Sequence, residues 1–191
     1  MAPKLILTGF MASGKSAVAR ALSRRLGWRL IDCDAEIAAR AGKPIQQIFR
    51  DSGEAQFRAL ERSIIAEIAA DRRRCPQCGE PRAAVVATGG GAIVDDANFA
   101  ALSACGVIIC LSARPDVIAR RIGSGAKARP MLTQSGTGLK QRIIELMDAR
   151  REAYARAAIT VDTSERNIEQ VVDAILKALA RYNPHQWKVS A

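Results

Sequence analysis

Hydrophobic residues in this chain form short continuous runs, and between the runs they recur every three or four positions. Short apolar runs are typical of buried β-strands, and the wider spacing is typical of helices with one buried face. The runs predict five strands, at residues 4–8, 29–31, 83–87, 107–111 and 159–161. Because strands and helices alternate, we expect an α/β fold in which right-handed connections place helices on both faces of a parallel sheet.

The helical spacing predicts where the covering helices lie. They are expected at residues 17–26, 35–41, 45–50, from 54 onward, 115–121, 139–157 and 168–182. Gly27 is expected to close the first of them. In the helix that follows residue 54, Phe57 and Ile64 belong to the apolar stripe and Arg58 lies off it. Spacing alone therefore places Arg58 on the surface.

Length and composition indicate one globular domain. The 191 residues are 49% hydrophobic and 25% charged, and no apolar run approaches the length of about 20 residues that a membrane span needs. We expect a single domain over residues 1–182 and a C-terminal tail over 183–191. No apolar leader precedes the first strand, so a cytoplasmic enzyme is the expectation.

The formal net charge of +10 indicates an anionic ligand. The arginines are scattered and only 4% of residues are aromatic, so no platform for stacking bases is visible. We therefore expect no nucleic-acid or membrane partner. The protein is also expected to be a monomer. The five cysteines include Cys105 and Cys110, which are expected to be buried thiols.

The other notable cysteines, Cys75 and Cys78, form a single C-x-x-C pair in a segment at about 72–82. Because a closed zinc site needs about four ligands, a surface insertion is the favoured interpretation. A zinc site shared across a dimer, or a redox pair, stays open as an alternative.

The segment Gly9–Ser16 fits the phosphate-loop pattern G-x-x-x-x-G-K-[ST], with a predicted strand before it and a predicted helix after it. Its glycines permit a tight turn, and its N–H groups add to the positive end of the helix dipole. In such a loop Lys15 reaches the β- and γ-phosphates of a nucleotide, and the Ser16 hydroxyl joins the shell of Mg²⁺.

Two carboxylates, Asp32 and Asp34, follow the second strand. If the chain stays extended there, both side chains point the same way, into the crevice at the carboxyl ends of the strands. The alternative is that Asp34 caps the helix at 35–41, and the spacing does not decide between them.

Two glycine-rich segments are further candidates for ligand binding. Gly89, Gly90 and Gly91 follow the third strand, and three consecutive glycines favour close approach of a ligand over a simple turn. Residues 123–130 are basic and glycine-rich, as expected of a mobile lid over a phosphate, at about 122–136. A plain solvated loop is the alternative for that segment.

Taken together, these segments resemble the shikimate kinase family over nearly the whole chain. The motifs that carry the resemblance are Gly9–Ser16, Asp32-x-Asp34, Gly53-Glu54 with Phe57-Arg58 and Glu61, Gly89–Gly91, Arg129–Leu132, Arg150 with Tyr154, and Val161–Thr163. The resemblance implies a three-layer P-loop kinase fold with sheet order 2-3-1-4-5. It also implies Mg²⁺-dependent transfer of the γ-phosphoryl of ATP to the 3-hydroxyl of shikimate.

The resemblance further implies residue roles. Lys15, Asp34 and Arg129 would be catalytic, and Ser16 and Asp32 would hold Mg²⁺. The nucleotide-binding residues would be Ala12, Ser13, Gly14, Lys15, Ser16, Ala17, Arg129 and Arg166. The substrate-binding residues would be Asp34, Arg58, Gly89, Gly90, Gly91 and Arg150.

The chain departs from the family pattern at three positions: Ala12 replaces a loop glycine, Ala17 a common threonine, and Ile168 a proline often found near adenine. The alternatives are a related small-metabolite kinase, such as a gluconate kinase, and an ATP-dependent P-loop protein that binds nucleic acid. A carboxylate clamp made of Arg58 and Arg150 would favour the metabolite kinases, because two arginines suit bidentate recognition of one carboxylate.

Overall fold

The structure is a computed structural model that describes residues 3–71, 83–123 and 138–182. Residues 124–136 of the expected lid, with Arg129, lie outside the described residues, as do the Cys75–Cys78 pair and the C-terminal tail. Among the helices that are described, none combines the length and the apolar character that crossing a membrane requires. The expected single-domain boundaries remain a prediction.

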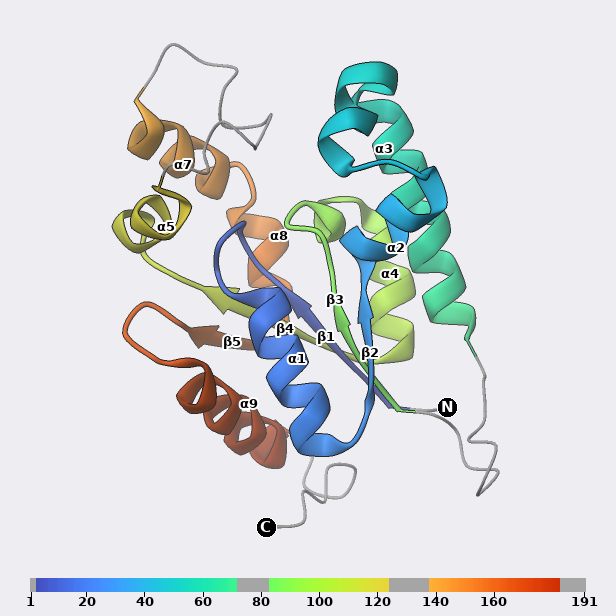
Figure 1. Cartoon of the computed structure of the whole chain (residues 1–191). Coiled ribbons are helices and arrows are strands. Elements are labelled where there is room, and N and C mark those ends of the chain that lie inside the picture. Colours follow the sequence, from blue (N-terminus) through green and yellow to red (C-terminus); the bar gives the residue numbers. More distant parts are fainter. Residues whose placement is uncertain (1–2, 72–82, 124–137, 183–191) are drawn as a thin grey trace.

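A five-stranded parallel sheet forms the centre of the molecule (Figure 1). Its strands are β1 (Lys4–Thr8), β2 (Arg29–Asp32), β3 (Ala84–Ala87), β4 (Val107–Ser112) and β5 (Ile159–Asp162). They follow the order β2-β3-β1-β4-β5, so the expected sheet is confirmed. In the register, Leu5 of β1 lies between Val85 and Val107. The phosphate loop therefore leaves the middle strand.

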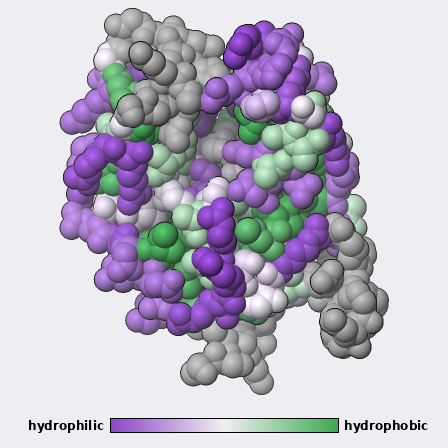
Figure 2. All heavy atoms as spheres, in the orientation of Figure 1, coloured by the Kyte–Doolittle hydropathy of each residue, from purple (hydrophilic) through white to green (hydrophobic). Residues whose placement is uncertain are grey.

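Successive residues of β1 alternate between two layers of helices. Leu5 and Leu7 are buried against α1 (Lys15–Leu26) and α9 (Ile168–Tyr182). Ile6 is buried in a second core that belongs to the opposite face. The helices of that core are α2 (Cys33–Ala41), α3 (Ile45–Ala70) and α4 (Asp96–Cys105), with the 3₁₀ turn η1 (Ala92–Val94). Figure 2 shows that hydrophilic residues cover most of the outer helix surfaces in this view.

A third cluster lies beyond the carboxyl ends of the strands. Phe10 of the phosphate loop packs there with α5 (Pro115–Ile122) and α7 (Leu139–Asp148). The short helix α8 (Arg151–Ala155) follows α7 and returns the chain to β5. This third cluster thus joins the phosphate loop to the segment that carries Arg150.

Several predicted boundaries were wrong in ways that matter for the site. The helix expected over 139–157 is two helices, because the chain leaves helical geometry at Arg150, with φ −112° and ψ 4°. Helix α2 begins at Cys33, earlier than expected, and Asp32 caps it. Helix α3 contains the expected break, at Gly53, with φ 74° and ψ 176°. Gly27 closes α1 in the left-handed conformation, as expected.

Candidate active site

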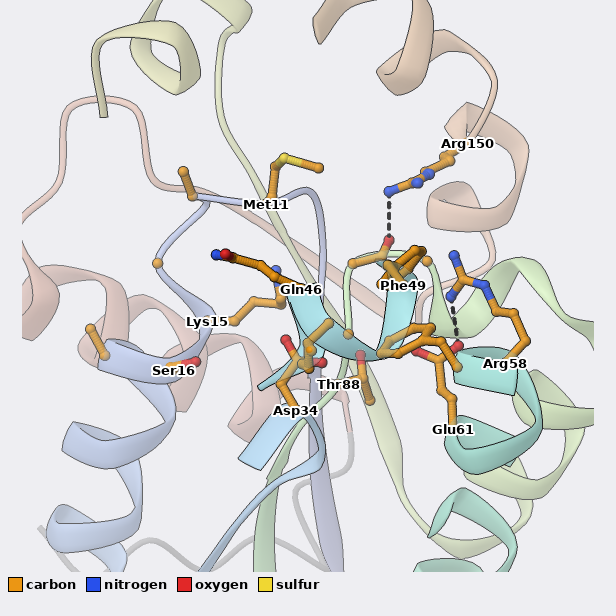
Figure 3. Close-up of a pocket in the computed structure, with 18 residues that line it drawn as sticks. Met11, Lys15, Ser16, Asp34, Gln46, Phe49, Arg58, Glu61, Thr88 and Arg150 are labelled. Atoms are coloured by element: carbon orange, nitrogen blue, oxygen red, sulfur yellow. Dashed lines mark hydrogen bonds and ion pairs between the residues drawn. The ribbon is translucent and has the colours of Figure 1, made fainter. Parts of the chain in front are cut away.

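The phosphate loop turns sharply out of β1. Gly9 has φ 132°, and a Cβ there would lie only 2.2 Å from the carbonyl oxygen of Leu111. Only glycine can therefore occupy this position. The Lys15 Nζ donates hydrogen bonds to the carbonyl oxygens of Gly9 and Phe10, each at 2.9 Å. The ammonium group thus lies across its own loop, next to a cavity (Figure 3).

Ala12 adopts a conformation that alanine rarely takes. Its φ is 59°, and it is the single described residue other than glycine with a positive φ. Its carbonyl oxygen accepts a hydrogen bond from Arg121 Nη1 at 3.4 Å. The loop thus keeps a left-handed turn at a position where the family pattern has glycine.

We expect the Ala12→Gly variant to be more stable than the wild type by up to about 1 kcal/mol, because a left-handed alanine carries a steric cost of about 1–2 kcal/mol. Urea denaturation measures the difference in the free energy of unfolding. Ala66, exposed within α3, is the matched control, and Ala66→Gly should lose about 1 kcal/mol. Equal losses in both variants would show that Ala12 is not strained.

Asp32 and Asp34 have different roles, and neither of the two alternatives for them holds as stated: the chain does not stay extended between them, and Asp34 is not the helix cap. The chain enters α2 at Cys33, and Asp32 Oδ1 accepts hydrogen bonds from the N–H groups of Asp34, at 3.1 Å, and Ala35, at 3.4 Å. The helix cap is therefore Asp32. Asp34, in the first turn, lines the cavity together with Lys15.

The electrostatic setting of Asp34 favours its protonated form more than water would. Desolvation by the cavity walls raises the pKa of this carboxyl, and the charge of Lys15 opposes part of that shift. Asp32 raises the pKa further, whereas Arg58 lowers it. A carboxylate with a raised pKa is better suited to accept a proton near neutral pH.

The cavity has a volume of about 490 Å³ and lies between the phosphate loop and α3. Its charged lining residues are Lys15, Asp34, Arg58, Glu61 and Arg150. Apolar side chains, among them Phe49 and Phe57, complete the wall. Phe49 and Phe57 contact each other, with ring centroids 4.8 Å apart. The space suits a compact molecule that carries both a negative charge and polar groups.

Each glycine of the triplet gives room to a different part of this site. A Cβ at Gly89 would lie 2.6 Å from Glu61 Oε1 and 3.2 Å from Asp34 Oδ1, and one at Gly91 would lie 2.9 Å from Arg58 Nη2. A Cβ at Gly90 would lie 3.3 Å from the carbonyl oxygen of Gly9 and 3.7 Å from Arg150 Nη1. The triplet therefore lets charged side chains and the phosphate loop converge around one stretch of backbone.

Arg58 is not the surface residue that its spacing predicted. Its guanidinium is ion-paired with Glu61 at 2.6 Å and with Glu54 at 3.0 Å, and its side chain is 24% exposed. Glu61 is buried, and burial raises its pKa against the lowering effect of Arg58. Within the described residues, Glu61 Oε1 has no hydrogen-bond partner.

Glu61 is a functional candidate to which the sequence analysis gave no role. The signal was its place on the buried stripe, one turn after Phe57 and one before Ile64 and Ile65. A carboxylate in such a position needs a cationic partner.

Arg150 lies at the break between α7 and α8, where its side chain is directed toward the triplet (Figure 3). It is 9% exposed, and its Nη1 donates to the carbonyl oxygen of Gly90 at 3.4 Å. Its guanidinium carbon lies 5.8 Å from the centroid of the Phe10 ring. The structure thus brings Arg150 together with Asp34 and Arg58, although the three are far apart in sequence.

The remaining expected nucleotide contacts lie around the loop. Ser16 is exposed at the start of α1 and lines the cavity together with Ala12, Gly14 and Ala17. The backbone oxygen of buried Ser13 accepts a hydrogen bond from Thr163 Oγ1 at 3.1 Å. Arg166 follows Thr163, is exposed and donates to the carbonyl oxygen of Asp162 at 2.6 Å. It does not line the cavity.

The donor set fits Mg²⁺ bound in its usual manner. Among the described residues, no group of three or more His, Cys, Asp and Glu side chains could hold a metal ion. Mg²⁺ in phosphoryl-transfer sites is commonly held by one or two protein oxygens, waters and substrate phosphates. The Ser16 hydroxyl lines the cavity and can supply one protein oxygen, whereas Asp32 is not among the residues that line it.

The sheet order, the phosphate loop and the charged cavity beside it define a P-loop kinase that acts on small molecules. The model of the family described as shikimate kinase matches residues 11–180. The chain belongs to the shikimate kinase family.

Comparisons with individual proteins agree. The chain is 40% identical to the shikimate kinase of Geobacter sulfurreducens, covering 90% of this chain and 87% of that protein. It is 41% identical to the enzyme of Desulforudis audaxviator, with 92% and 85% covered. The structure of the Acinetobacter baumannii shikimate kinase in complex with shikimate matches with a TM-score of 0.83 and 28% identity, over 95% of this chain and 94% of that one. A gluconokinase from Sinorhizobium meliloti shares only the fold, with a TM-score of 0.58 and 19% identity over 99% and 98% of the two chains.

Proposed function

We propose that this protein transfers the γ-phosphoryl group of ATP to the 3-hydroxyl of shikimate, giving shikimate 3-phosphate and ADP. The observation that carries the proposal is the convergence of Asp34, Arg58 and Arg150 on one cavity beside the phosphate loop. Two guanidinium groups and one carboxylate suit a ligand that bears a single carboxylate and several hydroxyls.

In this proposal the substrate carboxylate binds Arg58 and Arg150, and backbone groups of Gly89–Gly91 contact the ring. Asp34 orients the attacking hydroxyl and accepts its proton. The backbone N–H groups of residues 12–17 and the side chain of Lys15 bind the phosphates of ATP, with Arg166 near the base. Arg129 is proposed to close over the phosphates from the lid segment.

Ser16 and Asp32 are proposed to hold Mg²⁺, which when bound would neutralise charge on the β- and γ-phosphate oxygens. Asp32 already stabilises the start of α2, so its second oxygen would contribute through water. We further propose that the enzyme acts as a cytoplasmic monomer.

A coupled ADP-release assay tests the proposed reaction. ATP turnover should depend on shikimate, and gluconate or a short RNA in its place should give only the background rate. Turnover with gluconate and none with shikimate would contradict the proposal and favour a related sugar-acid kinase.

The Arg150→Met variant should raise the KM for shikimate about ten- to a hundredfold and leave the KM for ATP nearly unchanged. The reason is that one charge-assisted contact contributes about 1.5–3 kcal/mol. Steady-state kinetics with each substrate varied separately measures the effect. The neighbouring Arg151 has a side chain that is 77% exposed, so Arg151→Met is the control. A higher KM for ATP alone would show that the clamp is misassigned.

A further inference from the structure

Tyr154 makes a short hydrogen bond beneath the glycine triplet. Its hydroxyl donates to the carbonyl oxygen of Gly90 at 2.5 Å. The same oxygen is the acceptor for Arg150 Nη1, at the longer distance of 3.4 Å. Tyr154 follows Arg150 by one turn, and its N–H donates to the carbonyl oxygen of Arg150 at 3.0 Å. Two side chains from one short segment therefore share a single backbone acceptor.

The bond sets the direction of a peptide group in the cavity wall. In a trans peptide the C=O and the following N–H point in opposite directions. With the carbonyl of Gly90 directed to Tyr154 and Arg150, the N–H of Gly91 points away from them. Among the described residues, that N–H has no backbone or side-chain acceptor. Because glycine peptides rotate easily, a fixed orientation here depends on what holds the carbonyl.

We propose that Tyr154 is a positioning residue that holds the Gly90–Gly91 peptide and frees Arg150 to bind the substrate. The inference rests on the proposed function, in which Arg150 binds the substrate carboxylate. When Arg150 turns to that carboxylate, the carbonyl of Gly90 stays paired through Tyr154. Without the hydroxyl, the carbonyl would depend on Arg150 alone and compete with the substrate for the same guanidinium.

The hydroxyl of Tyr154 keeps its proton over the pH range in which an enzyme normally works. Burial raises the pKa of Tyr154 to about 12, although the charge of Arg150 opposes the shift. The thiol of Cys110 adds to the increase. Tyr154 therefore remains a neutral hydrogen-bond donor. A phenolate, which could not donate to the carbonyl of Gly90, does not form at these pH values.

The Tyr154→Phe variant tests the inference, because it retains the ring that packs in the core and removes only the hydroxyl. The KM for shikimate should rise about tenfold, while the KM for ATP stays within about twofold. The one other tyrosine in the sequence, Tyr182, is 56% exposed at the end of α9. Tyr182→Phe should therefore match the wild type. An unchanged KM for shikimate, or equal increases for both substrates, would overturn the positioning role.

A double variant tests the hold on the peptide. In the Arg150→Met protein the carbonyl of Gly90 keeps the Tyr154 hydroxyl as its donor, so adding Tyr154→Phe removes both donors and should raise the KM for shikimate severalfold further. No further increase would show that Tyr154 does not hold the peptide, and the inference would fail.

The burial of the Tyr154 hydroxyl, which the hydrogen bond to Gly90 requires, can be tested without any turnover. In the Tyr182→Phe protein, Tyr154 is the single remaining tyrosine, and its ionisation can be followed by absorbance at about 295 nm. We expect half-titration at a pH of about 12. Titration near 10, the ordinary value for tyrosine, would overturn the inference and leave the proposed kinase activity untouched. Conversely, a failure of shikimate to support turnover would remove the proposed function and leave this titration unaffected.

Discussion

Replacing Lys15 with methionine should lower kcat by about a hundred- to a thousandfold, the usual loss when one group that stabilises transition-state charge is removed. In the structure without ligand, the ammonium group is held by the carbonyl oxygens of Gly9 and Phe10. From there it reaches over the loop in which the phosphates of ATP are proposed to bind. Methionine preserves most of the apolar stem and removes the charge.

The fold should survive this change, because Gly9 and Gly14 shape the loop through their backbone and not through Lys15. Steady-state measurement of ADP release gives kcat, and circular dichroism checks the fold. Lys177, exposed on α9, provides the control variant Lys177→Met, which should retain wild-type turnover. A folded Lys15→Met protein with near wild-type kcat would contradict the role of the phosphate loop.

The Asp34→Asn variant should lose about a hundred- to ten-thousandfold in kcat, because an amide cannot accept the proton of the attacking hydroxyl. The KM values should change less. Asp173, exposed on α9 and paired with Arg25, offers the control Asp173→Asn, which should behave as the wild type. A loss confined to the KM for shikimate would show that Asp34 only binds the substrate.

The pH profile gives a second test of Asp34. Desolvation raises the pKa of this carboxyl above its ordinary value of 3.8. A general base acts when it is ionised, so wild-type kcat should be fully present above the raised pKa and fall as the pH drops through it. The acid limb should therefore lie at higher pH than an ordinary aspartate would give, and the residual activity of Asp34→Asn should lack it.

The sequence predicts the sheet and the phosphate loop well because local signals agree there. Buried parallel strands appear as continuous apolar runs, and the central strands β3, β1 and β4 follow such runs, whereas the edge strands β2 and β5 are only partly buried. The glycines of Gly9–Ser16 have conformations that their spacing requires, and Gly9 has no room for any side chain. The resemblance adds the strand order, which the structure confirms.

The candidate site is harder to predict, because its geometry depends on contacts distant in sequence. The helix expected over 139–157 looks continuous by periodicity, yet it breaks where Arg150 turns toward Gly90, 60 positions away. The spacing of Arg58 predicts a solvent-exposed side chain, but its ion pair with Glu61 places it in the cavity wall. Asp32 takes the cap at the strand end, and local spacing does not reveal that Cys33 already belongs to a helix.

The close packing around the glycine triplet limits which mutations could make this enzyme resistant to an inhibitor. A side chain at Gly89 or Gly91 would have to displace Glu61 or Arg58, and one at Gly90 would press on the backbone of Gly9 and Met11. Escape mutations in the triplet would therefore disturb the charges and the loop that the enzyme needs. Phe49 and Gln46 line the same cavity through side chains that can be exchanged. A compound anchored on the triplet backbone would leave the target fewer routes of escape than one anchored on those side chains.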